Sequence, residues 1–396
     1  MSLVPLPPGY RWRYARWYSI WFPQRNLYDS ILLLFTEGRS SESVVFRMLL
    51  DTLLKFPHLR GLTNALELRL PYDTLFHLQD RIGYMTRLSG VYHLFFLRGS
   101  TLFPRLRKLI LEHPPMLHPS LPRIIRPLSS VVELELITLQ HTSLFDTRTI
   151  ITYVFPNVKH LHLDIQMVLD NGYVLPNPPN LPCRARNRNT GLSLRSLFLG
   201  HPKMEPRIYN VITKWLLGTP SISSIQAFRT TSELYASWPL IIGFGKTLQK
   251  LEILWLRYYE TQDYISFESH KLPMLHVLYV LSITLPELPS FCNVISRGVS
   301  PTLSSLLIEV LVPPGGNAFD KRPWGVLDDT LSSSSFSNLK TIYLAVHPLN
   351  QPMTSNSRFF PQHADFDLNL VGTVLPKLKR ETKLEPGIHF RNRDWY

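Results

Sequence analysis

The stretch "FPNVKHLHLDI", residues 155–165, decides the fold, because a near copy, "FPRLRKLILE", occupies residues 103–112. Both fit the pattern L-x-x-L-x-L, in which L is any aliphatic residue. Copies begin at Leu106, Val131, Val158, Leu194, Ile222, Leu248, Leu275, Leu303 and Leu339, the one at Ile222/Ile225/Ala227 being degraded. Successive copies are 25 to 28 residues apart except for two steps of 36, so the pattern is a unit that repeats along the chain.

A proline two residues before the first aliphatic position is a second periodic mark. It occurs at Pro104, Pro156, Pro220, Pro273 and Pro301, and again at Pro57 and Pro376. Proline cannot continue a helix and favours extended backbone in the residue before it, so it indicates where a helix ends and a strand follows. The segments 41–57 and 204–220 have the apolar spacing of such helices.

A short strand and a helix in every 20 to 29 residues, with this leucine pattern, is typical of leucine-rich repeats. The chain resembles irregular leucine-rich repeat proteins of the ribonuclease-inhibitor-like type, in particular the repeat region of fungal F-box proteins. The resemblance implies an α/β solenoid over residues 56–380, with a parallel sheet on the concave side and helices on the convex side. Residues 65–70 and 85–96 are expected to be degenerate strands of it.

The remaining segments are assigned from their composition. Residues 1–55 are expected to be an N-terminal arm with capping helices, and residues 381–396 a basic tail. The two long steps predict exposed insertions at 170–191 and 313–336, because both stretches are rich in Pro, Asn, Ser or Gly.

Composition narrows the class of protein. The 396 residues are 44% apolar, which is enough for a folded core. Two distant cysteines, Cys183 and Cys292, favour a reducing compartment, so we expect an intracellular protein, cytoplasmic or nuclear. Apolar runs such as 31–35 are too short to span a membrane, and the N-terminus lacks the apolar core of a signal peptide.

Strand alternation predicts which side chains meet a partner, because residues between the aliphatic positions point to the opposite face. These candidate partner-binding residues are Glu133, Glu135, His160, His162, Asp164, Phe198, Phe228, Leu254, Tyr279, Leu281 and Tyr343. The first part of this face is acidic, whereas the part from Phe198 onward is apolar and aromatic. An exposed apolar and aromatic patch is typical of a protein interaction site. Two alternatives stay open: loops or the tail cover these residues, or the register is displaced by one.

The net charge of +13 gathers away from this face. Basic residues concentrate in the N-terminal arm (Arg11, Arg13, Arg16, Arg25), in the "RARNR" loop at 184–188 and in the C-terminal segment (Lys377, Lys379, Arg380, Lys383, Arg391, Arg393). Arginines interleaved with aromatic residues in the arm indicate an alternative function, binding of nucleic acid or an anionic surface. A solvated, solubilising surface is the plainer interpretation.

Motifs for catalysis are absent from the sequence: there is no phosphate-binding loop, dinucleotide fingerprint, nucleophile elbow or H-E-x-x-H. His160, His162 and Asp164 share one strand face and are ligands that zinc accepts, but polar residues are also the ordinary composition of such a face. We therefore expect no enzyme, no cofactor and no metal.

The resemblance implies a protein–protein interaction scaffold, monomeric by itself. Within the F-box family it implies the substrate-recognition subunit of a cullin-type ubiquitin ligase, bound through a ligase adaptor. An F-box opens with Leu-Pro followed by an acidic-aliphatic helix, whereas Leu6-Pro7 precedes "PGYRWRYARWY" in this chain. No F-box is therefore recognisable.

Overall fold

A computed structural model describes the protein in segments. They are residues 30–34, 42–69, 95–112, 126–140, 148, 151–166, 191–200, 206–231, 234–254, 271–297, 300–312, 320–348 and 375–380. The chain divides into two compact units, Met1–Leu194 and Arg195–Tyr396, and each is described by itself.

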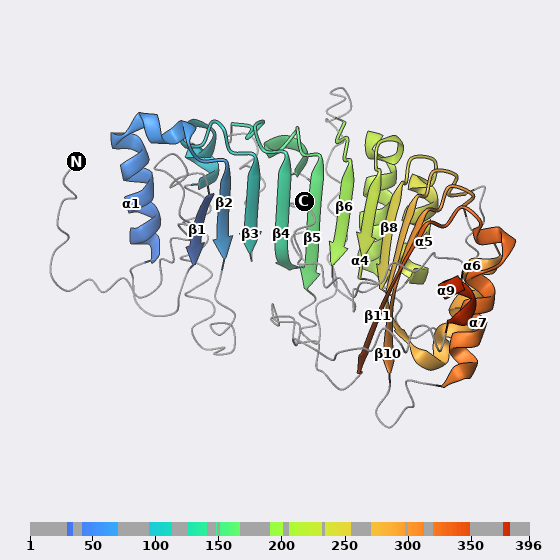
Figure 1. Cartoon of the computed structure of the whole chain (residues 1–396). Helices are drawn as coiled ribbons and strands as arrows, with labels where there is room; N and C mark the ends of the chain where they lie inside the picture. The colour runs from blue at the N-terminus through green and yellow to red at the C-terminus, as the bar shows by residue number, and fades with distance from the viewer. Residues whose placement is uncertain are drawn as a thin grey trace, which may run out of the picture. The chain divides into compact units, whose positions relative to one another are not determined.

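The first unit holds a parallel sheet whose strands follow one another in chain order (Figure 1). Its strands are β1 (Ser30–Leu34), β2 (Ala65–Arg69), β3 (Lys108–Glu112), β4 (Glu133–Gln140) and β5 (His160–Gln166). Helix α1 (Glu42–Lys55) and the 3-10 turn η2 (Pro57–Gly61) connect β1 to β2. Residues 95–102 and 151–154 are also helical.

The second unit repeats this plan with β6 (Ser196–Gly200), β7 (Ala227–Thr230), β8 (Lys250–Leu254), β9 (Val277–Thr284), β10 (Ser305–Val312) and β11 (Thr341–Pro348). Each strand pairs in parallel with the next. Its helical elements are α4 (Pro206–Leu217), η6 (Pro220–Ser223), α5 (Leu234–Phe244), η7 (Leu285–Glu287), α6 (Leu288–Ser296), α7 (Lys321–Leu331), η8 (Ser334–Phe336) and α9 (Pro376–Arg380). The predicted α/β class with a parallel sheet is confirmed.

The aliphatic positions of successive copies are hydrogen-bonded neighbours. Leu109, Leu134 and Leu161 lie side by side on β3, β4 and β5, and each is at most 2% exposed. Burying one leucine side chain contributes about 1.5–3 kcal/mol. A one-residue slip would turn this whole row to the other face, so the pattern fixes the register.

In four copies a proline marks a tight turn just before the strand, at Pro104, Pro156, Pro273 and Pro301. In the copy at Pro156, the amide of Val158 donates to the carbonyl of Phe155 at 3.3 Å. The copy at Pro104 repeats this bond from Leu106 to Phe103 at 3.2 Å. Proline suits the second position of such a turn because its φ is already near the required value. A strand therefore follows these four prolines as predicted, whereas Pro376 begins helix α9.

In four copies a polar side chain just before the first aliphatic position ties the turn to the preceding copy. Asn157 Nδ2 donates to the Ser129 carbonyl at 2.7 Å, and Thr247 Oγ1 donates to the Ile225 carbonyl at 2.7 Å. The same position supplies the bonds from Thr302 to Leu275 and from Asn338 to Pro301. These bonds satisfy carbonyls at the sheet margin, and sequence analysis missed them.

Strand β7 corrects the predicted register of the degraded copy. Phe228, predicted to lie on the partner-binding face, is 1% exposed and packs its ring 5.7 Å from that of Phe244 on α5. The copy is Ile225/Phe228/Thr230 rather than Ile222/Ile225/Ala227. Pro220 opens the longer turn η6, so the strand begins three residues later than the proline spacing predicted.

Thr230 confirms this corrected register from the helix side. Its hydroxyl lies 3.1 Å from Ser237 Oγ, which accepts a hydrogen bond from Tyr209 Oη at 2.9 Å. The three residues come from β7, α5 and α4. The inner face of β7 therefore packs against both helices.

Three further expectations differ from the structure. The predicted insertion 313–336 contains helix α7, whose buried Trp324, Leu327 and Leu331 have helical spacing that Pro323 and Gly325 obscured. Proline is tolerated there because it lies in the first turn, after the Asp320 N-cap. The predicted strand at 85–96 is helical at 95–96, and β1 extends the sheet N-terminal to residue 56. Residues 170–190 lie outside the described residues.

Candidate functional site

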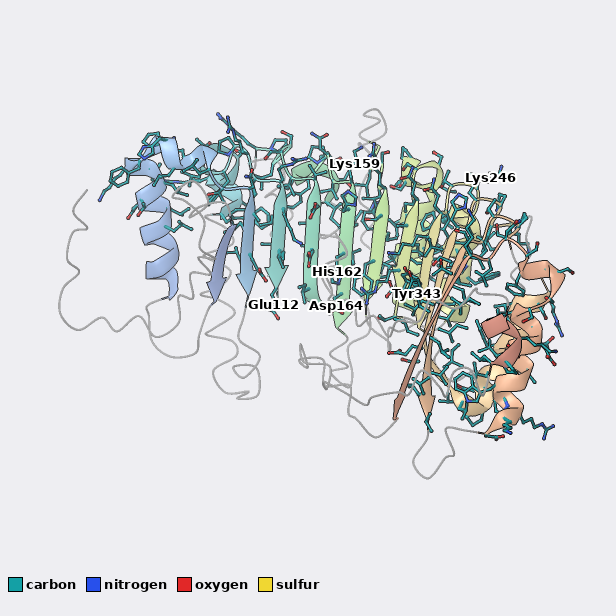
Figure 2. All side chains as sticks on the ribbon, in the orientation of Figure 1. Glu112, Lys159, His162, Asp164, Lys246 and Tyr343 are labelled. Atoms are coloured by element: carbon teal, nitrogen blue, oxygen red, sulfur yellow. The ribbon has the colours of Figure 1, made fainter. Side chains whose placement is uncertain are left out.

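Each sheet has a face opposite its buried leucines, and we call it the open face. In the first unit it carries Glu67, Lys108, Ile110, Glu112, Glu133, Glu135, Ile137, His160, His162 and Asp164, alternating with buried residues. Figure 2 labels Glu112, His162 and Asp164 on the strands that present them. All are partly exposed except Ile110, which is 6% exposed. The structure thus brings the five predicted polar residues of this unit onto one surface.

An ion network crosses β3, β4 and β5. Lys108 Nζ lies 2.9 Å from Glu135 Oε1 and 3.9 Å from Glu133 Oε2. On the other side of Glu135, His162 Nδ1 lies 3.5 Å from Oε2. Because the strands are parallel and adjacent, three side chains that are 27 residues apart in sequence become direct neighbours.

The Glu135 carboxylate is strongly stabilised in its ionised form. Burial alone would raise its pKa, but hydrogen bonds from His162 and Lys108 and the positive charge of Lys108 outweigh burial and lower the pKa to about 2. Only 12% of the side chain is exposed. Glu135 is therefore a fixed negative charge of this face at any physiological pH.

The open face of the second unit is more apolar and aromatic. The Arg229 guanidinium lies 4.5 Å from the centre of the Phe198 ring and its Nε lies 2.8 Å from Glu252 Oε1. In the next pair of strands, Lys250 Nζ lies 5.2 Å from the centre of the Tyr279 ring. A cation over an aromatic ring contributes about 0.5–2 kcal/mol. These contacts therefore hold the cationic and aromatic side chains in place before any partner binds.

The pKa of Glu252 is shifted in the opposite direction to that of Glu135. Burial raises its pKa, nearby Glu309 raises it further, and the charges of Arg229 and Lys250 only partly offset these effects. Only 12% of its side chain is exposed.

A bulge in β9 places the last acidic side chain of this face. Val280 pairs with Ile308 and Ile283 pairs with Val310, so β9 holds one residue more than β10 between these pairs. Ser282 adopts a positive φ of 61° there, which is uncommon for a residue with a side chain. Glu309 Oε2 accepts hydrogen bonds from Ser282 N at 2.8 Å and from its hydroxyl at 3.2 Å.

The predicted residues of this unit have different outcomes. Phe198, Leu281 and Tyr343 are partly exposed on the open face, and Figure 2 labels Tyr343. Tyr279 is on the same face but only 8% exposed, because its neighbours close over its ring. Phe228 lies in the core, and the side chain of Leu254 lies outside the described residues.

Arg229 is the residue of this face that sequence analysis missed, because the register of β7 was displaced. The sequence did contain evidence for the correct register of β7. Ile225, Phe228 and Thr230 have the same spacing as the other copies when the position of Pro220 is ignored.

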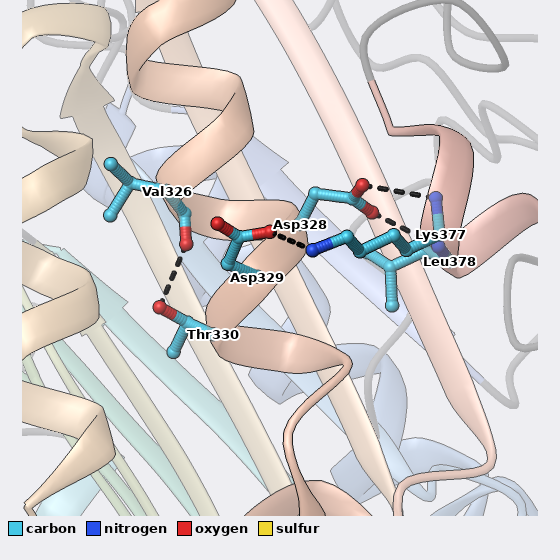
Figure 3. Close-up of polar contacts among 6 residues, drawn as sticks. All are labelled: Val326, Asp328, Asp329, Thr330, Lys377 and Leu378. Atoms are coloured by element: carbon cyan, nitrogen blue, oxygen red, sulfur yellow. Dashed lines mark hydrogen bonds and ion pairs between the residues drawn. The ribbon is translucent and has the colours of Figure 1, made fainter.

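Lys377, predicted to belong to the basic tail surface, has a structural role (Figure 3). Its amide and that of Leu378 each donate to the Asp328 carboxylate at 3.0 Å, and its ammonium group contacts Asp329. Asp328 is 2% exposed and Leu378 is fully buried. The two carboxylates of α7 therefore hold α9 against it.

No group of three or more His, Cys, Asp or Glu side chains suited to a metal ion occurs among the described residues. Cys292 is buried, and burial raises the pKa of its thiol to about 12, which leaves it unreactive. None of the helices in the described segments is long and apolar enough to cross a membrane. The basic arm and the 184–188 loop lie outside the described residues.

The chain matches no protein-family model, and no curated protein matches it either.

Proposed function

We propose that this chain is a leucine-rich repeat protein that binds a protein partner on its open face. The main observation behind this proposal is that side chains from successive strands of the second unit form one continuous row across the sheet. Phe198, Arg229, Glu252, Tyr279, Leu307 and Tyr343 come from six successive strands and occupy neighbouring register positions. Repeat proteins bind macromolecules on extended surfaces of this kind.

The composition of this row supports a protein partner. Tyrosine, phenylalanine and arginine are enriched among the residues that dominate binding free energy at protein interfaces. Glu252 and Arg229 neutralise one another, so the row does not have the basic charge that nucleic acid requires. We therefore favour protein binding over the nucleic-acid or anionic-surface alternative.

The F-box resemblance narrows the proposed partner. It favours a substrate of a cullin-type ubiquitin ligase, with this chain as an intracellular recognition subunit and not an enzyme. Affinity capture with the full chain tests this part: a cullin and its adaptor should be recovered together with the substrate. Recovery of one stable partner without them would leave a plain scaffold.

A pair of variants tests the binding face. Tyr343→Ala removes a partly exposed aromatic side chain of the open face, whereas Val211→Ala truncates a side chain that is 58% exposed on α4. With the captured partner purified, Tyr343→Ala should weaken binding by about 2 kcal/mol, as interface hot spots do. Val211→Ala should leave the affinity unchanged. The reverse result would place the interface on the helices and refute the proposal.

Salt dependence distinguishes protein binding from the alternative, which is binding of nucleic acid or an anionic surface. Binding through phosphate contacts weakens steeply as salt rises, because counterions are released. A captured partner that is nucleic acid, lost at high salt and insensitive to Tyr343→Ala, would favour the basic arm and tail.

A further inference from the structure

We propose that the turns before strands β2–β5 bind single-stranded nucleic acid. These turns, which we call the turn margin, comprise residues 56–64, 103–107, 126–132 and 155–159. The margin belongs to the first unit and precedes the strands, so it is separate from the open face. The inference goes beyond the proposed function and does not depend on it.

The turn margin carries positive charge and no negative charge, since its sequence contains no Asp or Glu. Its arginines and lysine are Arg60, Arg105, Arg107, Arg126 and Lys159. Figure 2 labels Lys159 at this margin. The carboxylates that follow the margin lie on the strands, where Glu133 and Glu135 are already paired with Lys108. A polyanion is therefore attracted to the margin and not to the strands.

Three of the margin's arginines are available to a ligand. Arg105, Arg107 and Arg126 are exposed, and none of them forms an ion pair with a described residue. Arg60 Nε donates to the Leu53 carbonyl at 2.7 Å and Lys159 Nζ to the Ser193 carbonyl at 3.3 Å, which leaves both charges in place. Arginine is suited to phosphate because its planar guanidinium donates two parallel hydrogen bonds.

Contacts between neighbouring turns make the margin one continuous surface. A methyl group on Gly61 would lie 3.9 Å from Arg105 Nε, so this guanidinium lies beside the turn η2. The amide of Arg107 donates to the Asn64 carbonyl at 2.8 Å, and the amide of Val132 donates to the Arg107 carbonyl at 2.8 Å. Four parallel strands about 4.8 Å apart give a row of about 14 Å, the length of about four stacked nucleotides.

Exposed aromatic rings lie at both ends of this row. Phe56 is 49% exposed, and Tyr153, on the helical turn before the last segment of the margin, is 42% exposed. The Val154 carbonyl accepts a hydrogen bond from the amide of Leu128 at 2.7 Å, which brings this helical turn next to the segment of Arg126. No other Phe, Tyr or Trp side chain that the structure describes is as exposed.

Cations together with exposed rings favour single-stranded nucleic acid over other polyanions. In such complexes the cations follow the phosphates while the bases stack on aromatic side chains. Inorganic polyphosphate would use the arginines and leave the rings without a role. In a duplex the bases already stack on one another, so the rings favour a single strand.

Neutral variants of the full chain test the charges, with short labelled oligo(U) and oligo(dT) as probes in fluorescence anisotropy. The margin pair is Arg105→Gln with Arg107→Gln. The control pair is Lys214→Gln with Arg322→Gln, which removes the same charge from exposed sites on α4 and α7. Circular dichroism establishes that both proteins are folded.

The wild-type chain should bind at least one of the oligonucleotides, and the tighter one identifies RNA or DNA as the ligand. Each phosphate contact on a single strand contributes about 0.7 to the slope of log affinity against log salt. The margin pair should therefore weaken binding and make this slope about 1.4 less steep. The control pair should leave the slope unchanged.

A second set of variants tests the rings. Phe56→Ala and Tyr153→Ala should each weaken oligonucleotide binding about fivefold, on the scale of a base stacked on an aromatic side chain. The salt slope should stay the same, because stacking is not ionic. Val211→Ala, which truncates a side chain that is 58% exposed on α4, is the matched control and should change neither quantity.

Failure of both oligonucleotides to bind, or equal effects of the margin and control pairs, would overturn the inference. So would tighter binding of polyphosphate or of phosphatidylserine vesicles, with Phe56→Ala and Tyr153→Ala having no effect. None of these outcomes touches the proposed function, whose test is the dependence of a protein partner on Tyr343 in the second unit.

Discussion

Two glutamates of the open face should respond in opposite ways to the same substitution. Glu135 and Glu252 each have 12% of the side chain exposed, and each pairs with a cationic side chain of a neighbouring strand, Lys108 for Glu135 and Arg229 for Glu252. The pKa of Glu135 is lowered, whereas the pKa of Glu252 is raised. Glu135→Gln should therefore destabilise its strand at neutral pH, while Glu252→Gln should leave its strand equally or more stable.

The magnitude for Glu135 follows from its pKa. A fall of the pKa from the ordinary glutamate value of 4.5 to about 2 corresponds to roughly 3 kcal/mol of folding free energy at neutral pH. Because the folded-state pKa is the lower one, this stability is present above pH 4.5 and is lost as the pH falls toward about 2. Glu135→Gln should remove both the stability and this pH dependence.

The sign reverses for Glu252. Burial favours its protonated form in the folded state, so the unfolded chain ionises first as the pH rises. The wild-type protein should lose stability from this site as the pH rises from the ordinary glutamate pKa to the raised value. Glutamine, which does not ionise, should abolish this loss.

Hydrogen exchange of peptides covering β4 and β8 measures both effects, because it reports local opening separately in each strand. Faster exchange should appear in β4 of Glu135→Gln at neutral pH, and exchange in β8 of Glu252→Gln should be unchanged or slower. Destabilisation of both strands to the same extent would refute the reasoning, since burial and cationic neighbours would then not decide the sign.

Three further substitutions have definite expectations. Phe228→Ala should cost about 3–5 kcal/mol by urea unfolding and Arg229→Ala about 1–2 kcal/mol, because only the first empties the core while the second loses contacts to Phe198 and Glu252; equal costs would contradict the register of β7. Asp328→Asn should cost about 1–3 kcal/mol and speed proteolysis of the C-terminal segment, since the two amides donate to different carboxylate oxygens and an NH2 group replaces one of them; unchanged proteolysis would exclude the role given to this carboxylate. Leu161→Asp should unfold the first unit as judged by circular dichroism, whereas His162→Asn should keep the fold and lose the contact to Glu135; the opposite order would mean that the two faces are exchanged.

The regular copies could be predicted from sequence because one periodicity carries the information. Leu109, Leu134 and Leu161 repeat at nearly constant spacing, and burial of each row in register then fixes strand, pairing and face together. The alternation that followed placed Glu135, His162 and Tyr343 on the open face correctly.

The errors arose where a local signal competed with this period. Pro220 begins a longer turn in the copy that contains Phe228, so the proline spacing displaced the strand. Pro323 and Gly325 suggested a loop although Trp324, Leu327 and Leu331 have helical spacing. In each case the burial of apolar side chains, and not the position of a proline or glycine, decided the structure.

Contacts between distant segments could not be predicted at all. The bonds from Asp328 to the amides of Lys377 and Leu378 join residues about 50 positions apart, and nothing periodic relates them. The network around Glu135 likewise requires side-chain conformations that alternation leaves open. The same holds for Tyr279, whose face was predicted but whose burial depends on its neighbours.

Lysine acetylation with and without the captured partner tests the binding face most directly. Lys108 and Lys250 lie on the open face, whereas Lys214 is exposed on α4 and Lys246 is exposed in the turn before β8. Mass spectrometry should show that the partner protects Lys250, while acetylation of Lys214 and Lys246 is unchanged. Protection of Lys214 or Lys246 with unchanged acetylation of Lys250 would contradict binding at the open face.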